Sequence, residues 1–244
     1  QFIAKNPFLS GNKGSLVEAE QRSSYNTAHQ SYHPIFKSFL DRFGYYDIFI
    51  ISADSGHVIY SVSKEIDFGT DILHGPLNKT NLSNAFKHVI ESDDPNYIYF
   101  EDFSPYLPSY NAPASFIASP IFDGDNKIGV LVFQLPIDRI NDIMTDDYHW
   151  EDVGLGESGE TYLVGSDYLI RNQSRFLVED PETYFQSLEK TDLSHDIISK
   201  IKILNSAIGL QPVITKGTQA AIKGETGTQK YSDYRGVEVL SAYK

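Results

Sequence analysis

The chain has 244 residues, enough for two domains of roughly 100 to 120 residues that each bury a core of their own. A net charge of −13 disfavours nucleic acid and anionic membrane surfaces as partners, because phosphate groups would repel the protein. The absence of cysteine excludes disulfide bonds, zinc–thiolate sites, iron–sulfur clusters and thiol catalysis. No apolar run approaches the roughly 18 residues that a membrane span needs.

A long helix is expected near the N-terminus. Ser15 and Glu18 have the spacing of a capping box, and apolar side chains recur at helical spacing between positions 25 and 43. Gly44 is a natural end for this helix, and Pro34 is expected to kink it or break it locally. We interpret a helix of this length before a small sheet domain as a strut that carries a signal.

A strand–turn–strand unit occurs once in each half of the chain, at residues 47–62 and again at 160–172. Each copy joins two apolar, β-prone runs through a turn rich in Ser, Asp and Gly. A helical stretch and further strands follow each copy. The repeat predicts an α+β fold in which the long helix precedes two tandem modules, each with a central antiparallel sheet flanked by helices.

The other elements follow in chain order. The first module is expected to continue with an amphipathic helix and three strands, at 81–91, 97–103, 114–122 and 127–135. A short helix over 137–144 leads to a boundary near 145–152. The second module is expected to hold its hairpin, two helices and two final strands, at 161–172, 181–188, 193–204, 226–233 and 237–243.

No motif indicates an enzyme. Residues 154–159 match the dinucleotide fingerprint GxGxxG, but that chemistry needs a preceding strand and a following helix. Here a linker precedes and a strand follows, so a glycine turn is the interpretation. His29 and His33 could share a metal ion on one helix face, yet no third ligand is evident, which favours surface or packed histidines. No catalytic residue, metal site or cofactor is assigned.

Residues 100–116 form the strongest candidate for a site. Aromatic rings, hydroxyl groups and two carboxylates occur together in a segment stiffened by prolines between two strands. Such a loop can close over a sheet and present apolar walls with a few fixed polar groups, as small-ligand pockets require. A rigid structural loop whose aromatic side chains fill the core is the alternative.

Four stretches of the chain resemble the double Cache family, also called PDC-type tandem sensor domains: residues 43–56, 114–123, 129–138 and 154–165. Members of this family are extracytoplasmic ligand-binding parts of bacterial histidine kinases, chemoreceptors and nucleotide cyclases. The resemblance covers nearly the whole chain. It implies a long N-terminal helical segment and two PAS-like modules, one distal and one proximal to the membrane, over residues 1–44, 45–146 and 147–244.

The resemblance also implies a location and partners. The chain is expected to be the periplasmic, extracytoplasmic part of an inner-membrane receptor, whose transmembrane helices flank it. A homodimer through the N-terminal helix is expected, with no nucleic-acid partner. Amino-acid-binding members carry Arg-x-Trp-Tyr ahead of the fourth strand, where this chain has Tyr106-Leu-Pro-Ser-Tyr110. The guanidinium that would clamp a ligand carboxylate is therefore missing. Gln134 stands where such members place an amine-binding Asp, and Asp123 matches another family carboxylate.

These observations predict a non-enzymatic sensor domain that binds a small organic molecule in the distal module. A histidine kinase is the receptor class expected first. The sensor of a chemoreceptor or cyclase, an exported hydrolase and a structural dimerisation module are the alternatives. Seven residues are expected to bind the ligand. Asp102 is the acceptor, Tyr106 and Tyr110 are walls that carry hydroxyl groups, and Ser109 is a polar contact. Phe100 and Phe116 form an apolar floor, and Gln134 supplies an amide.

Overall fold

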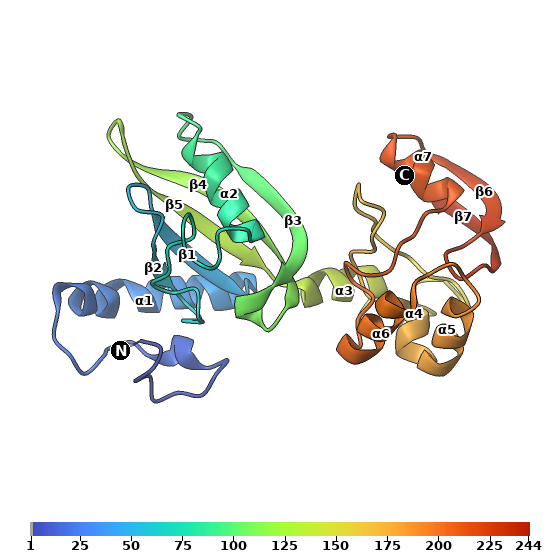
Figure 1. Ribbon diagram of the computed structural model, residues 1–244, viewed down its shortest axis with the longest axis horizontal. Coiled ribbons are helices and arrows are strands. Elements are labelled where there is room, and N and C mark those ends of the chain that lie inside the picture. The colour runs from blue at the N-terminus through green and yellow to red at the C-terminus, as the bar shows by residue number, and fades with distance from the viewer. Residues whose placement is uncertain (1) are drawn as a thin grey trace. The chain divides into compact units, whose positions relative to one another are not determined.

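The computed structural model describes residues 2–244 and divides the chain into two compact units, Gln1–Pro136 and Ile137–Lys244 (Figure 1). An N-terminal helix precedes an antiparallel sheet with flanking helices, which confirms the predicted α+β class. Within the described residues, no helix is both long and apolar enough for a membrane crossing.

Helix α1 spans Ser24–Phe43 and begins later than the sequence predicts. Its N-cap is Ser23, whose hydroxyl oxygen accepts a hydrogen bond of 3.0 Å from the backbone N–H of Asn26. Ser15 instead ends a short 3₁₀ helix, η1 (Lys13–Ser15), so the predicted capping box is wrong.

The physical reason is a set of tertiary hydrogen bonds that hold the preceding segment extended. The Asn26 amide donates to the carbonyl of Ala19 and accepts from its N–H, at 2.9 and 2.8 Å. One buried side chain thus satisfies backbone groups that a longer helix would have paired internally.

Helix α1 continues through Pro34, and the break expected there is absent. Proline removes the N–H that would donate to the carbonyl of Gln30, and Gln30 is exposed, so water can satisfy that carbonyl. The helix ends at Gly44 as predicted. Gly44 has a φ of 72° and donates its N–H to the carbonyl of Leu40.

The first unit holds five strands in the order β2-β1-β5-β4-β3, with every neighbouring pair antiparallel. In chain order they are β1 Asp47–Ser52, β2 Val58–Ser61, β3 Tyr99–Tyr106, β4 Ala112–Asp123 and β5 Asn126–Leu135. All five lie where the sequence predicts a strand, but β3 and β4 extend further into the segment predicted as a loop. The connection shrinks to a 3₁₀ helix, η2 (Leu107–Ser109), and two residues with positive φ.

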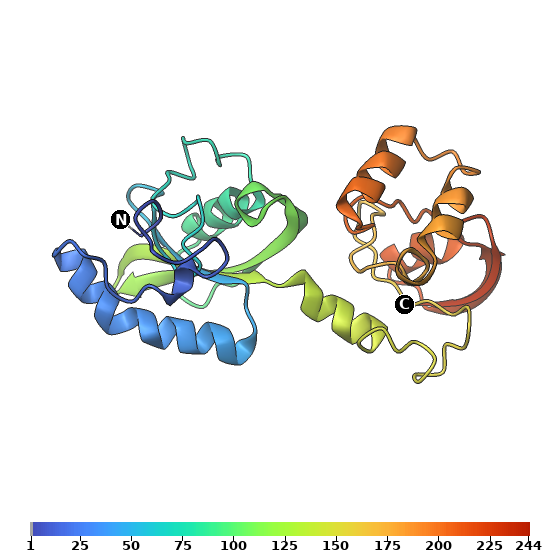
Figure 2. The same ribbon diagram turned by 90° about the horizontal axis from the view of Figure 1, so that it is seen from below.

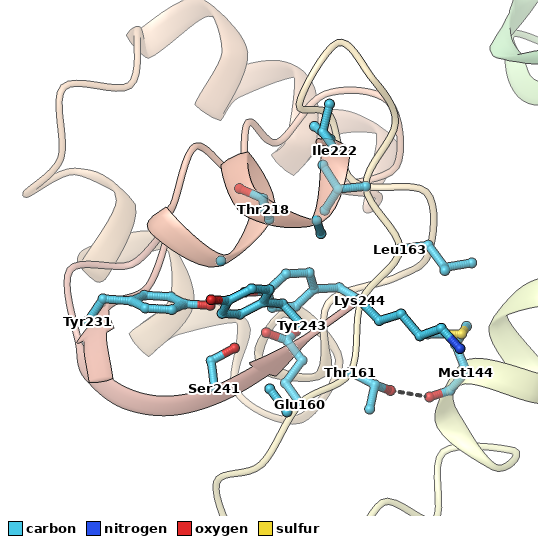
Figure 3. Close-up of a pocket in the computed structure, with 15 residues that line it drawn as sticks. Met144, Glu160, Thr161, Leu163, Thr218, Ile222, Tyr231, Ser241, Tyr243 and Lys244 are labelled. Carbon is cyan, nitrogen blue, oxygen red and sulfur yellow. Dashed lines mark hydrogen bonds between the residues drawn. The ribbon is translucent and has the colours of Figure 1, made fainter. Parts of the chain in front are cut away.

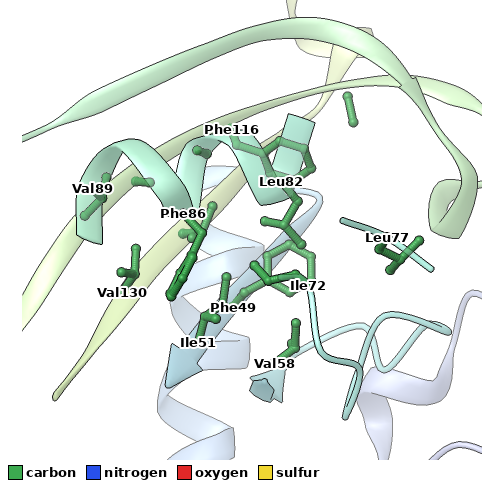
Figure 4. Packing of buried hydrophobic residues seen from close by; sticks show 14 of the residues in the cluster. Phe49, Ile51, Val58, Ile72, Leu77, Leu82, Phe86, Val89, Phe116 and Val130 are labelled. Carbon is green, nitrogen blue, oxygen red and sulfur yellow. The ribbon is translucent and has the colours of Figure 1, made fainter. Parts of the chain in front are cut away.

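Each face of this sheet is covered by one helix (Figures 1 and 2). Because side chains alternate along β1, Ile48 joins the cluster that contains Phe36 and Leu40 of α1. Phe49 joins the larger cluster on the other face, under helix α2 (Asn81–Ile90), where Phe86 contributes its ring (Figure 4).

The second unit has a smaller sheet, in which β6 (Gly227–Ser232) pairs only with β7 (Glu238–Tyr243). Its helices are α3 Ile137–Thr145, α4 Arg175–Glu179, α5 Pro181–Leu188, α6 His195–Leu204 and α7 Lys216–Ile222. The hairpin predicted at 161–172 is reduced to an isolated bridge between Val164 and Ile170. The N–H of Leu163 donates to the Asn172 side chain, which replaces a carbonyl partner that a continuing ladder would supply.

Residues 154–159 form turns, and no helix follows them directly. Gly154 and Gly156 have φ values of 85° and 60°, a region that glycine occupies without strain. The glycine-turn interpretation of the GxGxxG match is therefore confirmed.

We predict that Phe86→Ala destabilises the first unit by about 3 to 5 kcal/mol, because Phe86 is fully buried beneath α2. Trp150 is the single tryptophan and belongs to the second unit, so its fluorescence reports unfolding there, whereas circular dichroism reports both units. In urea, the transition seen by circular dichroism should shift and the Trp150 transition should not.

Ile98→Ala is the control, because Ile98 is 68% exposed and its truncation should change stability by less than about 0.5 kcal/mol. An equal shift of the Trp150 transition in Phe86→Ala would show that the two units unfold as one.

Candidate functional site

Polar side chains are buried at one end of the α2-facing side of the five-stranded sheet. Asp47 of β1 pairs with Gln134 of β5, and Gln134 pairs with Phe116 of β4. Residues directly opposite in antiparallel strands share a face, so these three side chains lie in a row. All three side chains are buried. A carboxylate and an amide therefore lie at the edge of the apolar core.

Two further carboxylates reach this place from the connection between β2 and α2. The Tyr106 hydroxyl donates to Asp67 Oδ2 at 2.9 Å, and the Tyr46 hydroxyl donates to Glu65 Oε1 at 2.9 Å. Asp67 is fully buried. The connection is irregular, and its carboxylates are oriented by these hydroxyl groups.

Ser109 links the Glu65 carboxylate to Gln134 of the sheet. Its hydroxyl donates to Glu65 Oε2 at 3.3 Å and accepts from Gln134 Nε2 at 2.9 Å. These neighbouring polar side chains are called the acid cluster below: the hydrogen-bonded series Glu65, Ser109 and Gln134, the pair Asp67 and Tyr106, and Asp47 opposite Gln134 in the sheet.

Two oxygen atoms of the acid cluster are buried without a hydrogen-bond partner among residues 2–244, namely Asp67 Oδ1 and Gln134 Oε1. Leaving a buried acceptor unsatisfied costs about 1 to 3 kcal/mol, and native proteins keep few such atoms. The ring of Tyr106 packs edge-on against Phe116, with ring centroids 5.2 Å apart, and supplies an aromatic wall beside these acceptors.

Burial dominates the electrostatics of the acid cluster. It raises the pKa of Asp67 to about 8, with a further contribution from the charge of Asp47. Burial also raises the pKa of Asp47 to about 6, against four hydrogen bonds to its carboxylate that lower it, and the pKa of Glu65 to about 6. Across the described residues, no salt bridge joins these three carboxylates to a Lys, Arg or His side chain.

Four of the seven residues expected to bind a ligand lie together in or against the acid cluster: Tyr106, Ser109, Phe116 and Gln134. The other three are exposed. Phe100 pairs with Ile117, the neighbour of Phe116, so alternation directs it to the opposite face of the sheet. Asp102 lies where the register of β3 shifts, and one of its oxygens accepts from the N–H of Phe103. Tyr110 has a φ of 58° in the turn after η2 and is 68% exposed.

Sequence reasoning did not include Asp47, Glu65 and Asp67. One signal for Asp47 exists, because it occupies the same alternating set as Phe49 and Ile51, which a buried strand face fills with apolar residues. Glu65 and Asp67 lie in an irregular connection, where no periodicity indicates which side chains turn inward.

His29 and His33 are packed side chains, one of the two alternatives that their spacing left open. Their rings stack with centroids 4.3 Å apart, and His33 contacts the Gly14 carbonyl and the Tyr60 hydroxyl at 2.7 and 2.8 Å. Burial lowers the pKa of both imidazoles to about 4. The buried ammonium of Lys64 lies 3.2 Å from His33 Nε2, and burial lowers its pKa to about 7.

No protein-family model matches the sequence, and a search of curated proteins finds none similar to it. Similar solved structures exist. One is the ligand-binding domain of the Pseudomonas aeruginosa amino-acid chemoreceptor PctC in complex with GABA, at 13% identity and a TM-score of 0.39, covering 65% of this chain and 62% of that one.

A second is the sensor domain of the Vibrio cholerae histidine kinase DctB, at 15% identity and a TM-score of 0.38, covering 54% of this chain and 49% of that one. A third is the ligand-binding domain of the Pseudomonas fluorescens chemoreceptor CtaA with L-serine, at 14% identity and a TM-score of 0.41, covering 69% and 65%. The chain thus spans less than two thirds of each of these structures. All three are sensor or ligand-binding domains.

We predict that Asp67→Asn becomes more stable relative to the wild type as the pH rises. The pKa of Asp67 is raised in the folded state, so the stability that its protonated form contributes is complete below about pH 4 and is lost as the pH rises through about 8. Asparagine does not titrate, so the variant does not lose this stability as the pH rises. The difference in unfolding free energy should change by up to about 1.4 kcal/mol per pH unit in that window, measured by urea unfolding.

Asp54→Asn is the matched control, because Asp54 is exposed in the turn after β1. A difference between Asp67→Asn and the wild type that stays constant across the window would show that the Asp67 carboxyl titrates as in an unfolded chain.

Proposed function

We propose that this chain is the extracytoplasmic ligand-sensing part of a signalling receptor and that it binds a small organic molecule at the acid cluster. The observation that carries the proposal is the pair of buried, unpartnered acceptors, Asp67 Oδ1 and Gln134 Oε1, beside an aromatic wall. A few convergent polar groups against apolar walls are what a small-ligand site requires.

The chemistry of the acid cluster favours a protonated amine. Gln134 Oε1 is an acceptor, and Asp67 Oδ1 is one when its carboxyl is ionised, so a ligand that satisfies both atoms donates N–H or O–H groups. Within residues 2–244 no salt bridge joins the carboxylates of the acid cluster to a Lys, Arg or His side chain, and a ligand cation would compensate the charge that burial penalises. Because these carboxyl groups have raised pKa values, binding a cation would shift them toward ionisation and release protons.

The acid cluster lies close to the end of α1 along the chain. Tyr46, which donates to Glu65, is only three residues beyond the last residue of α1. A ligand that draws Glu65 or Asp47 toward itself would compete with this contact and favour another position of the helix. The ligand would then act by differential affinity for two positions of α1.

The receptor that we favour is a sensor histidine kinase, with a chemoreceptor or nucleotide cyclase as the alternative output. In this proposal the chain itself performs no catalysis. Residues 45–146 would form the membrane-distal, ligand-binding module and residues 147–244 the membrane-proximal one. Membrane helices outside this sequence would carry the shift of α1 to the cytoplasm.

A second copy of the chain is the proposed partner of α1. Four large apolar side chains follow one another at spacings of three and four residues along the helix and remain exposed: Tyr32, Ile35, Phe39 and Phe43. The adjoining side of the same helix, which carries Phe36 and Leu40, contributes the buried contacts to the sheet. An apolar stripe with this spacing is the pattern of a helix that pairs with another helix.

We predict that Asp67→Asn and Gln134→Leu each weaken binding of a primary amine identified in a thermal-shift screen by about tenfold or more. Gln134→Leu removes an acceptor, and Asp67→Asn removes the charge and replaces one carboxyl oxygen by an NH2 donor; a hydrogen bond to a charged group contributes about 1.5 to 3 kcal/mol. Isothermal titration calorimetry of the chain in two buffers of different ionisation enthalpy should also show proton release.

Asp102→Ala combined with Tyr110→Ala is the matched comparison, because both side chains are exposed. The placement at the acid cluster predicts little change for this double variant. If it abolished binding while Asp67→Asn did not, the ligand would lie at the exposed turn instead.

We predict that Ile35→Glu combined with Phe43→Glu makes the chain monomeric, because two charges would be buried in the pairing stripe. Sedimentation velocity of wild type and variant measures this. Gln30→Glu adds a charge to another face of α1 and should leave the dimer intact. A wild-type chain that stays monomeric at millimolar concentration would exclude the proposed pairing.

A further inference from the structure

The second unit contains a cavity that the proposed function does not use. Its volume is about 410 Å³, within the range of small-molecule pockets. It lies between helix α7, strands β6 and β7, and the segment 160–164 (Figure 3). Every residue that lines it belongs to Ile137–Lys244, so the cavity is a property of this unit alone.

One carboxylate lies at the wall of the cavity. Glu160 Oε1 accepts from the Ser174 hydroxyl and the Arg175 N–H, at 2.8 and 2.9 Å. Glu160 Oε2 accepts only from the Tyr234 hydroxyl, at 2.9 Å, and retains capacity for a further favourable contact. These hydrogen bonds hold the carboxylate in place, and no salt bridge joins it to a cation in the part of the chain that the structure describes.

Three tyrosines supply aromatic rings to the same cavity, namely Tyr162, Tyr231 and Tyr243. The rings of Tyr231 and Tyr243 project from neighbouring strands into it above Glu160 (Figure 3). The negative faces of aromatic rings attract a cation, most strongly a cation that sheds its water easily. Lys244 is the one cationic residue of the lining, and its side chain extends toward Met144, away from Tyr231 (Figure 3).

We propose that this cavity is a second binding site and that it takes a weakly hydrated organic cation, of the methylated-ammonium class. Glu160 supplies the charge and the tyrosine rings supply the cation–π contacts. The aliphatic side chains of Leu163, Val164, Ala221 and Ile222 surround the methyl groups. The site differs in chemistry from the acid cluster, whose unpartnered acceptors favour an ammonium group with N–H donors, which a quaternary nitrogen lacks.

The test is isothermal titration of choline into the whole chain, beside its neutral isostere in which carbon replaces the quaternary nitrogen. We expect choline to bind and the isostere to bind about tenfold more weakly or not at all, because only the charge differs. Equal binding of both would overturn the cation proposal, and absence of choline binding would overturn the site.

Variants then locate the site. Tyr231→Leu should weaken choline binding about tenfold, whereas Tyr231→Phe, which keeps the ring, should retain it. Tyr32→Leu, at an exposed tyrosine of the first unit, should have no effect. Asp67→Asn should also have none, and a loss of choline binding in that variant would place choline at the acid cluster and overturn the second site. The fluorescence of Trp150 in the same unit reports whether the Tyr231 variants are folded, and circular dichroism reports it for Tyr32→Leu and Asp67→Asn.

Discussion

The hydrogen bonds of one buried carboxylate organise the first unit. Asp47 Oδ1 accepts from the N–H groups of Ile48, Val62 and Ser63, and Oδ2 accepts from the Ser61 hydroxyl, all within 3.0 Å. These contacts join the start of β1 to the end of β2 and fix where the following connection departs from the sheet. Glu65 and Asp67 lie in that connection, so their inward orientation depends on the Asp47 carboxylate. An unpaired buried charge would be far more costly than this satisfied one.

The same arrangement makes the first unit less stable than an apolar core would be. Two buried carboxyl groups, Asp47 and Asp67, and the half-buried Glu65 have raised pKa values that oppose folding at neutral pH, and two acceptors remain unpaired within residues 2–244. Proteins keep such groups where function requires them. A site that is preorganised for a ligand is strained, or has unsatisfied groups, when the ligand is absent. The buried apolar cluster around Phe49, Phe86 and Phe116 contributes stability that offsets this cost.

The two units differ in the size of their sheets and in the arrangement of their polar side chains. The first covers both faces of a five-stranded sheet and gathers buried polar side chains at one end of one face. The second has two paired strands, and side-chain hydrogen bonds rather than a longer ladder hold the segment 160–172. A cavity remains beside that segment. In our proposals the first site therefore selects donors of hydrogen bonds, and the second selects charge and apolar shape.

The sequence by itself determined the elements of the first unit and its α+β class, because period-two and period-3.6 patterns report which face of an element is buried. It also singled out Tyr106, Ser109, Phe116 and Gln134, which lie in β3, η2, β4 and β5. Tertiary structure alone decided that α1 begins at Ser24, that Phe100 lies on the face opposite Phe116, and that Glu65 and Asp67 turn inward. Strand register and long-range hydrogen bonds set these features, and neither produces a periodic pattern in the sequence.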